Sequence, residues 1–468
     1  MTVFPLKFTR LASDYLFVDD AGGYFRANGS FLDRYAGGDL TGSDAEFLHT
    51  NGHAFDEVGD PAYMGFAYRW AQRLHRPQEL NYVILVPTLR CNLACGYCQV
   101  SRVNEKTGGF DWTEDTLAQV LRFLDGMDTE SAKIEFQGGE PLLRLDLLET
   151  VREFARRKFK DVSFTVCTNL QSVSYEAWTF LDASDTFVST SLDGDLAAHQ
   201  RQRTITSRST DQFVSNLRYG IGRLGREKVS ALPTLDINNL PAPNQIIETF
   251  GDFGFRSIFL RPINHQGFAR KRYQTMGGDK RWNEYHGRFI DALIEHNWTA
   301  DFPVEEFYFT HCLRRVLRGG HNHHVDLRNP NILGKDYIVI DFDGTFYPSD
   351  EARMVTRVGQ IDLSVGNLWD GIDQVKLDVL NAEATNSFHP ECIHCPYQAA
   401  CGVDVIDDLS RYGRIDVPKR DTTFCRRHTA IFDKIFELLY SDDKKAQKSL
   451  AAWAGIPEFD NSLAPIHT

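Results

Sequence analysis

The sequence predicts an α/β fold built around a parallel sheet. Between about residues 81 and 265, strand-like and helix-like segments alternate six times, and such alternation implies parallel strands joined by right-handed crossovers. Three cysteines follow the first of these strands on a short loop, and a second group of cysteines lies beyond residue 306. Ligands in folds of this class bind where strands end, so we expect the first cysteine group at the functional end of the sheet.

The strand and helix signals can be placed along the chain. The expected strands are Tyr82–Val86, Lys133–Phe136, Val162–Val166, Thr186–Ser191, Val229–Ile237 and Ser257–Leu260. Amphipathic helices are expected between them, for example at Thr113–Phe123 and Pro141–Phe159. Thr113 is suited to cap the first of these helices, because Glu114 and Asp115 follow in its first turn.

The first 80 residues are expected to form a separate, small α+β unit. Its short β-rich runs are Leu6–Arg10, Asp14–Val18 and Gly23–Ala27. Two segments after them, Ser30–Tyr35 and Pro61–Leu74, are expected to be helical. Towards the other end of the chain, Ile431–Tyr440 is amphipathic and is expected to pack on the core.

Composition limits the classes of partner. The 468 residues include 42% hydrophobic residues, which supplies ample core. The net charge of −13 argues against nucleic acid, because phosphate binding needs a basic footprint, and it favours a basic peptide as partner. The N-terminal segment does not resemble a secretion signal, and no apolar run is long enough to span a membrane, so we expect a cytoplasmic protein without a membrane partner. Nine unevenly spaced cysteines then indicate metal ligation rather than disulfides.

The first cysteine group has an open coordination pattern. Cys91, Cys95 and Cys98 form a C-x3-C-x2-C run on one loop, and soft thiolates select zinc, copper or an iron–sulfur cluster. A structural zinc ion and a cubane cluster closed by protein alone both need four ligands. Three thiolates therefore leave one metal corner open for a substrate or cofactor. A partial zinc knuckle or a buried thiol cluster is the alternative.

The segment CNLACGYC, which contains these cysteines, resembles the cluster loop of the radical S-adenosylmethionine (SAM) superfamily. The resemblance implies a [4Fe-4S] cluster whose fourth iron is chelated by the methionine moiety of SAM, and one-electron cleavage of SAM to a 5'-deoxyadenosyl radical. It implies that Tyr97 packs beside the adenine. It also implies that the six strand–helix units form the open, partial (β/α)6 barrel of that superfamily.

Segments at the ends of later strands match the same superfamily. Gly138, Gly139 and Glu140 match its GGEP segment, whose backbone and glutamate meet the methionyl amino group, and glycines let a backbone come close to a ligand. The residues that match its contacts to the ribose or sulfonium side of SAM are Thr168, Asn169, Ser191 and Asp193. Arg203 falls where a basic residue pairs with the methionyl carboxylate, with Arg201 as the alternative. Each of these segments alone could be an ordinary strand-to-helix turn.

Other residues have less specific signals. Cys167, in the third strand, is expected to be a buried structural thiol. Arg261 and Pro262 end the sixth strand at the same mouth, where the arginine could orient substrate or neutralise a cofactor charge. The histidines expected in a solvated loop, rather than at a metal, are His321, His323 and His324.

The second cysteine group resembles the SPASM-type extension of radical SAM peptide maturases. That extension uses seven cysteines for two auxiliary clusters in its full form. The four that match its second cluster are Cys392, Cys395, Cys401 and Cys425. Two other cysteine positions of the extension are Ser349 and Val405 here, so we expect the first auxiliary cluster to be absent and Cys312 to be an orphan thiol. A four-cysteine zinc site is the alternative for the second cluster.

Asp350 is the candidate catalytic residue. In sulfatase maturases an aspartate at the corresponding place acts as a base, so the resemblance makes Asp350 a candidate proton acceptor. A turn aspartate that bonds its own backbone is the alternative.

A closer resemblance is to the maturase of the His-Xaa-Ser peptide system, on the segments TFYPSDEARM, CIHCPYQAACG, TTFCRRH, IFLRPINHQGFA and CQVSR. It implies a ribosomally made precursor peptide with His-Xaa-Ser repeats and a partner radical SAM enzyme. Reduction of the cluster implies an external electron donor such as flavodoxin or ferredoxin. The N-terminal unit resembles the winged peptide-recognition element of such enzymes, which implies leader binding by strand addition, with a simple barrel cap as the alternative.

The expected function is radical modification of a peptide. The adenosyl radical would take hydrogen from a side-chain carbon, and cross-link formation or oxidation would follow. A formylglycine-forming maturase of the sulfatase type is one alternative, against which the missing auxiliary cluster weighs. A cluster-bearing peptide-binding scaffold for a partner enzyme is another. The expected domains are residues 1–80, the barrel at 81–305, the SPASM-type extension at 306–440 and a tail at 441–468.

Overall fold

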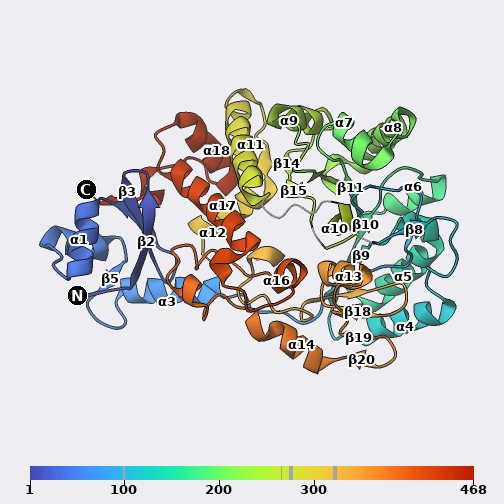
Figure 1. The fold of residues 1–468 in the computed structure, drawn as a ribbon, viewed down its shortest axis with the longest axis horizontal. Helices are drawn as coiled ribbons and strands as arrows, with labels where there is room; N and C mark the ends of the chain where they lie inside the picture. Colours follow the sequence, from blue (N-terminus) through green and yellow to red (C-terminus); the bar gives the residue numbers. More distant parts are fainter. Residues whose placement is uncertain (99–100, 265, 273–277, 320–323, 468) are drawn as a thin grey trace.

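The computed structural model describes the chain except residues 99–100, 265, 273–277, 320–323 and 468 (Figure 1). Figure 1 shows the N-terminal unit at one end of the molecule and the central sheet with its helices at the other. The helices between them are α11 (Asp279–Thr299), α12 (Phe307–Leu317), α16 (Val405–Tyr412), α17 (Thr423–Leu439) and α18 (Lys444–Ala454). The segment 431–439 of α17 packs on the core through buried Ile431, Phe432 and Ile435, as predicted.

The N-terminal unit is a small sheet covered by helices. Its strands run in the order β2 (Leu6–Leu11), β3 (Asp14–Asp19), β4 (Tyr24–Ala27) and β21 (Ile466–His467). The three predicted β-rich runs are therefore strands. Strand β3 pairs antiparallel with β2 on one side and with β4 on the other. The fourth strand comes from the far end of the chain and pairs parallel with β4. Phe17, Phe25 and Phe31 form the centre of this unit's own core.

Helices follow these strands where the sequence supplies caps. They are α1 (Gly29–Gly37), α2 (Gly42–Thr50) and α3 (Pro61–Arg73). The side chains of Asn28, Thr41 and Asp60 accept hydrogen bonds from the first turns of these helices. Two short strands of the same unit, β1 (Thr2–Val3) and β5 (Ala54–Phe55), pair antiparallel with each other.

The central sheet has the strand order β12, β11, β10, β9, β6, β17 and β18. The strands that match predicted ones are β6 (Tyr82–Leu85), β9 (Ser131–Phe136), β10 (Asp161–Cys167), β11 (Thr186–Ser191) and β12 (Val229–Leu232). They follow one another in chain order and pair parallel, as the alternation predicted. The helices between them are α4 (Glu114–Asp125), α5 (Leu145–Lys158), α6 (Tyr175–Leu181), α7 (Leu196–His199) and α8 (Ser207–Leu224), and α9 (Pro243–Asp252) follows the last of them. Thr113 caps α4, as predicted.

Two predicted strands differ from the structure. The fifth breaks at Pro233 into β12 and β13 (Thr234–Leu235), because proline has no N–H to donate to a ladder. The sixth ends early as β14 (Ser257–Ile258), which pairs with β16 (Glu305–Glu306) rather than with the central sheet. The partner of β13 is β15 (Arg261–Pro262), which continues the curved wall of strands.

Residues beyond 306 extend the central sheet. Strand β17 (Tyr337–Ile340) pairs parallel with β6, and β18 (Phe346–Tyr347) pairs antiparallel with β17. Helix α13 (Asp350–Arg357) follows β18 directly. The remaining short elements are β7 (Arg90–Cys91), β8 (Val103–Asn104), β19 (Gly366–Asn367), β20 (Gly371–Ile372), α10 (Ala269–Arg272), α14 (Gln374–Leu380) and α15 (Pro390–Ile393).

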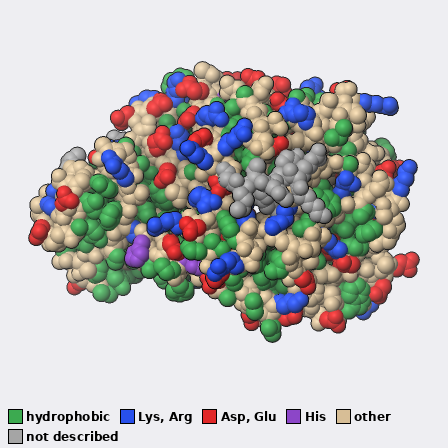
Figure 2. All heavy atoms as spheres, in the orientation of Figure 1, with side chains coloured by type: hydrophobic (Ala, Val, Ile, Leu, Met, Phe, Trp, Pro, Cys, Tyr) green, Lys and Arg blue, Asp and Glu red, His purple; other side chains and the backbone are tan. Residues whose placement is uncertain are grey.

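The surface is charged and mixed. Figure 2 shows Lys and Arg side chains around the middle of the visible face and acidic side chains spread along its outline. Among the residues described, no helix combines the length and the apolar character needed to cross a membrane.

Candidate functional site

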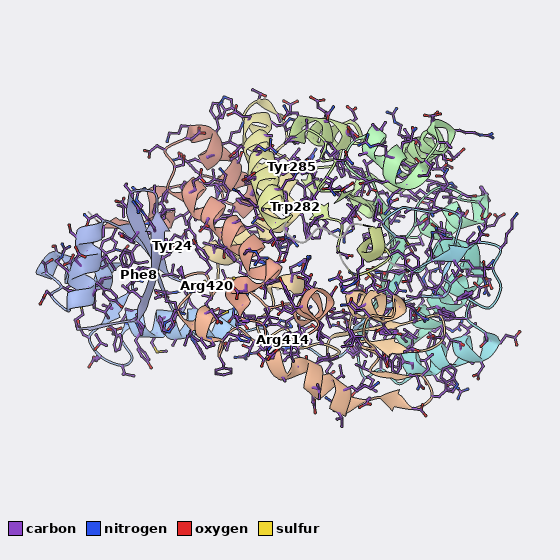
Figure 3. All side chains as sticks on the ribbon, viewed as in Figure 1. Phe8, Tyr24, Trp282, Tyr285, Arg414 and Arg420 are labelled. Atoms are coloured by element: carbon purple, nitrogen blue, oxygen red, sulfur yellow. The ribbon has the colours of Figure 1, made fainter. Side chains whose placement is uncertain are left out.

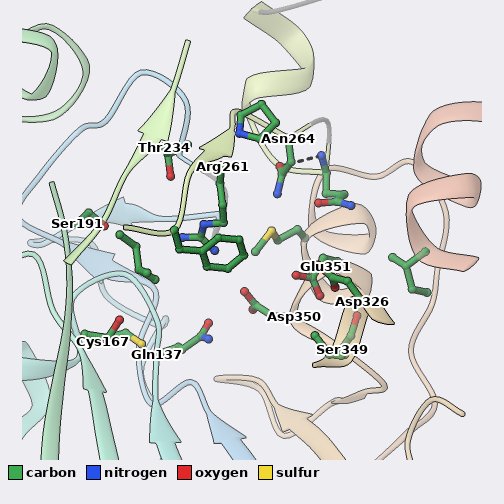
Figure 4. A pocket seen from close by; sticks show the side chains of 18 of the residues that line it. Gln137, Cys167, Ser191, Thr234, Arg261, Asn264, Asp326, Ser349, Asp350 and Glu351 are labelled. Carbon is green, nitrogen blue, oxygen red and sulfur yellow. Dashed lines mark hydrogen bonds between the residues drawn. The ribbon is translucent and has the colours of Figure 1, made fainter. Parts of the chain in front are cut away.

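A cavity of ≈ 590 Å³ lies along one face of the central strands and reaches their carboxyl ends (Figure 4). We call it the central cavity. One side is formed by the cysteine loop and the ends of β9, β10 and β11, and the other by the start of α13 and the segment 324–333. The chain therefore brings residues from both predicted halves, 81–305 and 306–440, to one site.

The three cysteines of the first group share this cavity. Cys91, Cys95 and Cys98 all line it, and none of the three forms a disulfide in the described structure. Burial raises the pKa of Cys91 to about 12, and its neighbouring thiols add to that shift. A buried thiol with a raised pKa ionises when a metal takes the place of its proton. Three soft sulfur donors around one space therefore fit an iron–sulfur cluster.

Within the described ranges, no group of three or more His, Cys, Asp or Glu side chains is placed to hold a metal ion. A cluster makes a different demand, because each thiolate of an iron–sulfur cluster binds its own iron atom. The loop is fixed by backbone bonds, from Cys98 N–H to the Cys95 carbonyl (3.2 Å) and from Gly96 N–H to the Gln202 carbonyl (3.1 Å).

The two glycines after β9 are required by the cysteine loop itself. A Cβ at Gly139 would lie 2.5 Å from the carbonyl oxygen of Leu89 and closer still to that of Arg90. Gly138 has φ +143°, and a Cβ there would meet the carbonyl oxygen of Thr88. We predicted that these glycines admit a ligand. The structure shows that they admit the backbone of the loop, although both also line the central cavity.

Glu140 lies behind the cavity wall. It is 1% exposed, and its carboxylate accepts hydrogen bonds from the N–H of Leu142 (3.2 Å) and of Asn169 (2.8 Å). Burial raises its pKa to about 7. In this position Glu140 ties the end of β9 to the end of β10, and its side chain is not among those that line the cavity.

Three other predicted SAM contacts do line the central cavity, namely Thr168, Asn169 and Ser191. The Asn169 amide nitrogen donates to Asn92 Oδ1 (2.8 Å) and lies 3.7 Å from Cys91 Sγ. The polar end of β10 is therefore in direct contact with the cysteine loop.

Tyr97, Asp193 and Arg203 form one buried group. The Tyr97 hydroxyl donates to Asp193 Oδ2 (2.6 Å), and Arg203 Nε donates to the Tyr97 hydroxyl (2.8 Å) and to Asp193 (3.1 Å). Arg203 also lines the central cavity, whereas Arg201 is exposed, so the structure places Arg203 and not Arg201 at the site. Asp193 is fully buried and holds the other two side chains in place.

Two predictions about minor residues are wrong. Cys167 is half-buried rather than buried, and its thiol donates to Glu135 Oε1 (3.2 Å) and lines the central cavity. The alternation of β10 was a signal for this, since Phe164 and Val166 are buried on the opposite face. His324 is not in a solvated loop but lies against Phe259 and Tyr308 and lines the same cavity. The predictions for His321 and His323 lie outside the described residues.

Asp350 lines the central cavity at the first turn of α13. Its carboxylate accepts hydrogen bonds from the Arg353 guanidinium (3.0 Å from Nε), rather than from its own backbone. Burial raises the pKa of Asp350, and the Arg353 charge opposes that rise. Ser349, at a cysteine position of the SPASM pattern, caps α13. Arg261 also lines the cavity, with its guanidinium 5.4 Å from the Phe259 ring centre.

The second cysteine group lines a second cavity, of ≈ 850 Å³. The four thiols here are Cys392, Cys395, Cys401 and Cys425. Burial raises their pKa values, and the thiols raise one another's further. The other side of the cavity is formed by residues 8–14 of the N-terminal unit, and Figure 3 shows Phe8 and Arg420 on either side of it. Cys312 is fully buried in α12, and Val405 is buried in a separate apolar cluster.

Sequence reasoning missed several acidic residues of the central cavity, namely Asp326, Glu351, Asp404 and Asp407. They come from separate segments, and only the folded chain places them on one wall.

Comparisons with known proteins agree with this geometry. The profile of the radical SAM superfamily matches residues 85–222. The chain is 30% identical over 236 residues to a probable GTP 3',8-cyclase of Methanopyrus kandleri, which covers 46% of this chain and 74% of that protein. It is 29% identical over 117 residues to the uncharacterized protein MJ0907 of Methanocaldococcus jannaschii, covering 25% of this chain and 39% of that one. The match thus spans well under half of the latter relative.

Among solved structures, native anSMEcpe with bound AdoMet and Cp18Cys peptide superposes with a TM-score of 0.60 at 20% identity. The superposition covers 76% of this chain and 96% of that one, and at this identity it shows a shared fold. The superfamily match runs from β6 through α8, the stretch that carries the first cysteine group and the polar strand ends. This chain belongs to the radical SAM superfamily.

Proposed function

We propose that this protein modifies a ribosomally made peptide by radical chemistry at a side-chain carbon, ending in a cross-link or an oxidation. Membership of the superfamily implies SAM and a [4Fe-4S] cluster. The observation that carries the proposal is the central cavity, which is lined both by the three free thiols of the cysteine loop and by Asp350 at the start of α13. When bound, the cluster and SAM supply a 5'-deoxyadenosyl radical that takes hydrogen from the substrate.

The residues of this chain have three proposed roles, which are to hold the cluster, to orient SAM and to accept a proton. Cys91, Cys95 and Cys98 would hold the cluster, and the group around Arg203 would meet the anionic end of SAM. Asp350, which lines the cavity, would accept a proton from the substrate. Burial raises its pKa, which makes it a stronger base than an exposed aspartate.

The second cavity supports an auxiliary cluster on Cys392, Cys395, Cys401 and Cys425. Four thiols around one space are enough to close a cubane, and a cluster held there would supply an electron acceptor for the oxidation. The N-terminal unit is proposed to bind the precursor by strand addition. Strand β21 covers the edge of β4, and within the described residues the outer edge of β2 has no strand partner.

A peptide substrate is supported by the fold shared with anSMEcpe, which is solved with a bound peptide, and by the resemblance to the His-Xaa-Ser maturase. The GTP 3',8-cyclase relatives favour a second candidate, a nucleotide substrate. The two candidates differ in a simple assay, because only one of them consumes GTP.

The test is anaerobic reconstitution with iron, sulfide, dithionite and SAM, followed by measurement of 5'-deoxyadenosine. A synthetic peptide with a His-Xaa-Ser repeat, or GTP, is then added, and the products are read by mass. We expect 5'-deoxyadenosine from the wild type, a mass change in the peptide and no change in GTP. Cys91→Ala should abolish 5'-deoxyadenosine and lower the iron content, whereas Cys312→Ala, at a buried thiol that lines neither cavity, should not abolish 5'-deoxyadenosine. No 5'-deoxyadenosine from the reconstituted wild type would refute the proposal.

A further inference from the structure

We propose that the N-terminal unit contains a binding pocket for a histidine side chain of an extended peptide, and that His467 of the chain itself occupies this pocket in the structure. We call it the histidine pocket, and it is formed by Phe31, Asp44 and Phe47. The inference goes beyond the proposed function, which places the precursor on the outer edge of β2 and assigns no ligand to the edge of β4. A peptide with a histidine at the matching position would replace β21 there.

The histidine pocket is shaped for an imidazole ring. The His467 ring stacks on Phe47 with 4.5 Å between the ring centres, and it meets the Phe31 ring edge-on at 5.2 Å. Its Nε2 donates a hydrogen bond to Asp44 Oδ1 (2.6 Å). Two aromatic rings and a carboxylate acceptor together favour a flat ring that carries an N–H donor. An aliphatic or acidic side chain lacks one or both of these features.

Asp44 is held in place without the help of His467. It is fully buried, and the Arg34 guanidinium donates to both of its carboxylate oxygens at 2.7 Å. The hydroxyl and the backbone N–H of Thr41 donate to Oδ2 as well (2.7 and 2.8 Å). The hydrogen bonds from Arg34 lower the pKa of Asp44 below its ordinary value, although burial opposes this shift. The acceptor of the pocket therefore stays charged and oriented when the imidazole leaves.

The N-terminal unit has a core that does not depend on β21. Among the described residues, its apolar cluster is drawn from positions 3–54, and neither residue of β21 belongs to that cluster. Strand β21 is only two residues long, and Ile466 is 47% exposed. The unit can therefore keep its fold while β21 leaves, as a site for strand addition requires.

Main-chain pairing supplies the part of the binding that any peptide can use. Strand β21 pairs parallel with β4, and His467 lies opposite Ala27. The N–H of Arg26 donates to the carbonyl oxygen of Pro465 (2.9 Å). Figure 1 shows the C-terminal segment reaching the N-terminal unit. Backbone bonds of this kind need no particular side chain, so the histidine pocket supplies the sequence preference.

Because β21 belongs to the same chain, it competes with a free peptide for the edge of β4. A tethered segment acts at an effective concentration on the order of millimolar. The wild type should therefore bind a free histidine peptide more weakly than a chain whose own histidine has been removed.

The test measures fluorescence anisotropy of a labelled peptide, fluorescein-Gly-Ser-Val-Ile-His-Val-Ser-amide, with the reconstituted wild type and with His467→Ala. We expect the variant to bind the peptide about tenfold more tightly than the wild type, because its pocket is empty. The same peptide with alanine in place of histidine should bind the variant about tenfold more weakly. The matched control is His49→Ala, at a side chain of the same unit that is 48% exposed, and it should bind like the wild type.

Two further variants locate the preference. Asp44→Asn and Phe47→Ala, each added to His467→Ala, should bind the histidine and alanine peptides equally, and thermal unfolding shows whether each protein is folded. If His467→Ala does not fold, the wild type serves in its place, because it should show the same preference for histidine at higher peptide concentrations.

Equal binding of the histidine peptide to the wild type and to folded His467→Ala would overturn the inference. Equal binding of the histidine and alanine peptides to that variant, or to the wild type where it serves in its place, would overturn it as well. Anisotropy does not depend on radical chemistry, whereas the proposed function is judged by 5'-deoxyadenosine. The failure of one is therefore distinguishable from the failure of the other.

Discussion

Gly139→Ala tests how closely the cysteine loop and the end of β9 depend on each other. The new Cβ would lie 2.5 Å from the Leu89 carbonyl oxygen, where ordinary contacts begin at 3.4 Å. The atoms in its way are backbone, so they cannot rotate aside. Relief requires the loop to move outward by about 1 Å, which weakens the bonds from Gly139 N–H to Thr88 O (3.0 Å) and from Glu140 N–H to Arg90 O (2.8 Å). Two weakened hydrogen bonds and the strain of overpacking together cost about 3–5 kcal/mol.

Urea denaturation of the apoprotein measures this loss of unfolding free energy, and iron content after reconstitution measures the displaced loop. Gly222→Ala is the matched control, because Gly222 lies in α8 with open space around its Cβ position. We expect that control to stabilise the protein by about 0.5–1 kcal/mol, since glycine is a poor helix former. A Gly139→Ala protein within about 0.5 kcal/mol of wild type and with full iron content would refute the packing argument.

Three further outcomes follow from the site. Asp193→Asn leaves the half-buried Arg203 without its carboxylate partner, so we expect the unfolding free energy measured by urea denaturation to fall by about 3–5 kcal/mol. A fall below about 1 kcal/mol would contradict the role of Asp193 in positioning Arg203. The ordinary pKa of a glutamate is 4.5, and burial raises that of Glu140 to about 7 in the folded protein. Glu140 therefore ionises first in the unfolded chain, and the unfolding free energy should fall by about 3 kcal/mol as the pH rises from about 4.5 to 7. Glu140→Gln should flatten that slope. Asp350→Asn should slow peptide modification about a hundredfold while 5'-deoxyadenosine still forms. Because burial raises the pKa of Asp350, the wild-type rate should fall on the acid side of neutrality. Equal rates of modification by the variant and the wild type would show that Asp350 is not the base.

Much of the barrel was predictable because its signals are local. Strands β6, β10 and β11 are short runs rich in β-branched residues, β9 alternates between buried and more exposed side chains, and the Thr113 side chain caps the first turn of α4. Pro233 marks the one place where a predicted strand had to break. The early end of β14 depends on a distant partner, since the Leu260 N–H donates to Glu306 Oε1 (3.0 Å) instead of to a neighbouring strand.

The candidate site was predictable only where a contiguous motif carries it. The two cysteine groups and Arg203 lie where the pattern placed them, at the walls of two cavities. The acidic residues of the central cavity were not predictable, because Asp326, Glu351 and Asp404 come from separate elements that meet only in the folded chain. The location of Glu140 behind the wall also needed coordinates, since a motif fixes residue order but not the direction of a side chain.

The pairing of β21 with β4 has a consequence for the order of synthesis. His467 Nε2 donates a hydrogen bond to Asp44 Oδ1 across 423 residues of sequence (2.6 Å), and the His467 ring stacks on Phe47 with 4.5 Å between the ring centres. A ribosome adds about 5–20 residues per second, so the N-terminal unit waits tens of seconds for its last strand after its first three have emerged. During that interval the edge of β4 is bare, and a chaperone or another nascent chain could occupy it before residue 467 arrives.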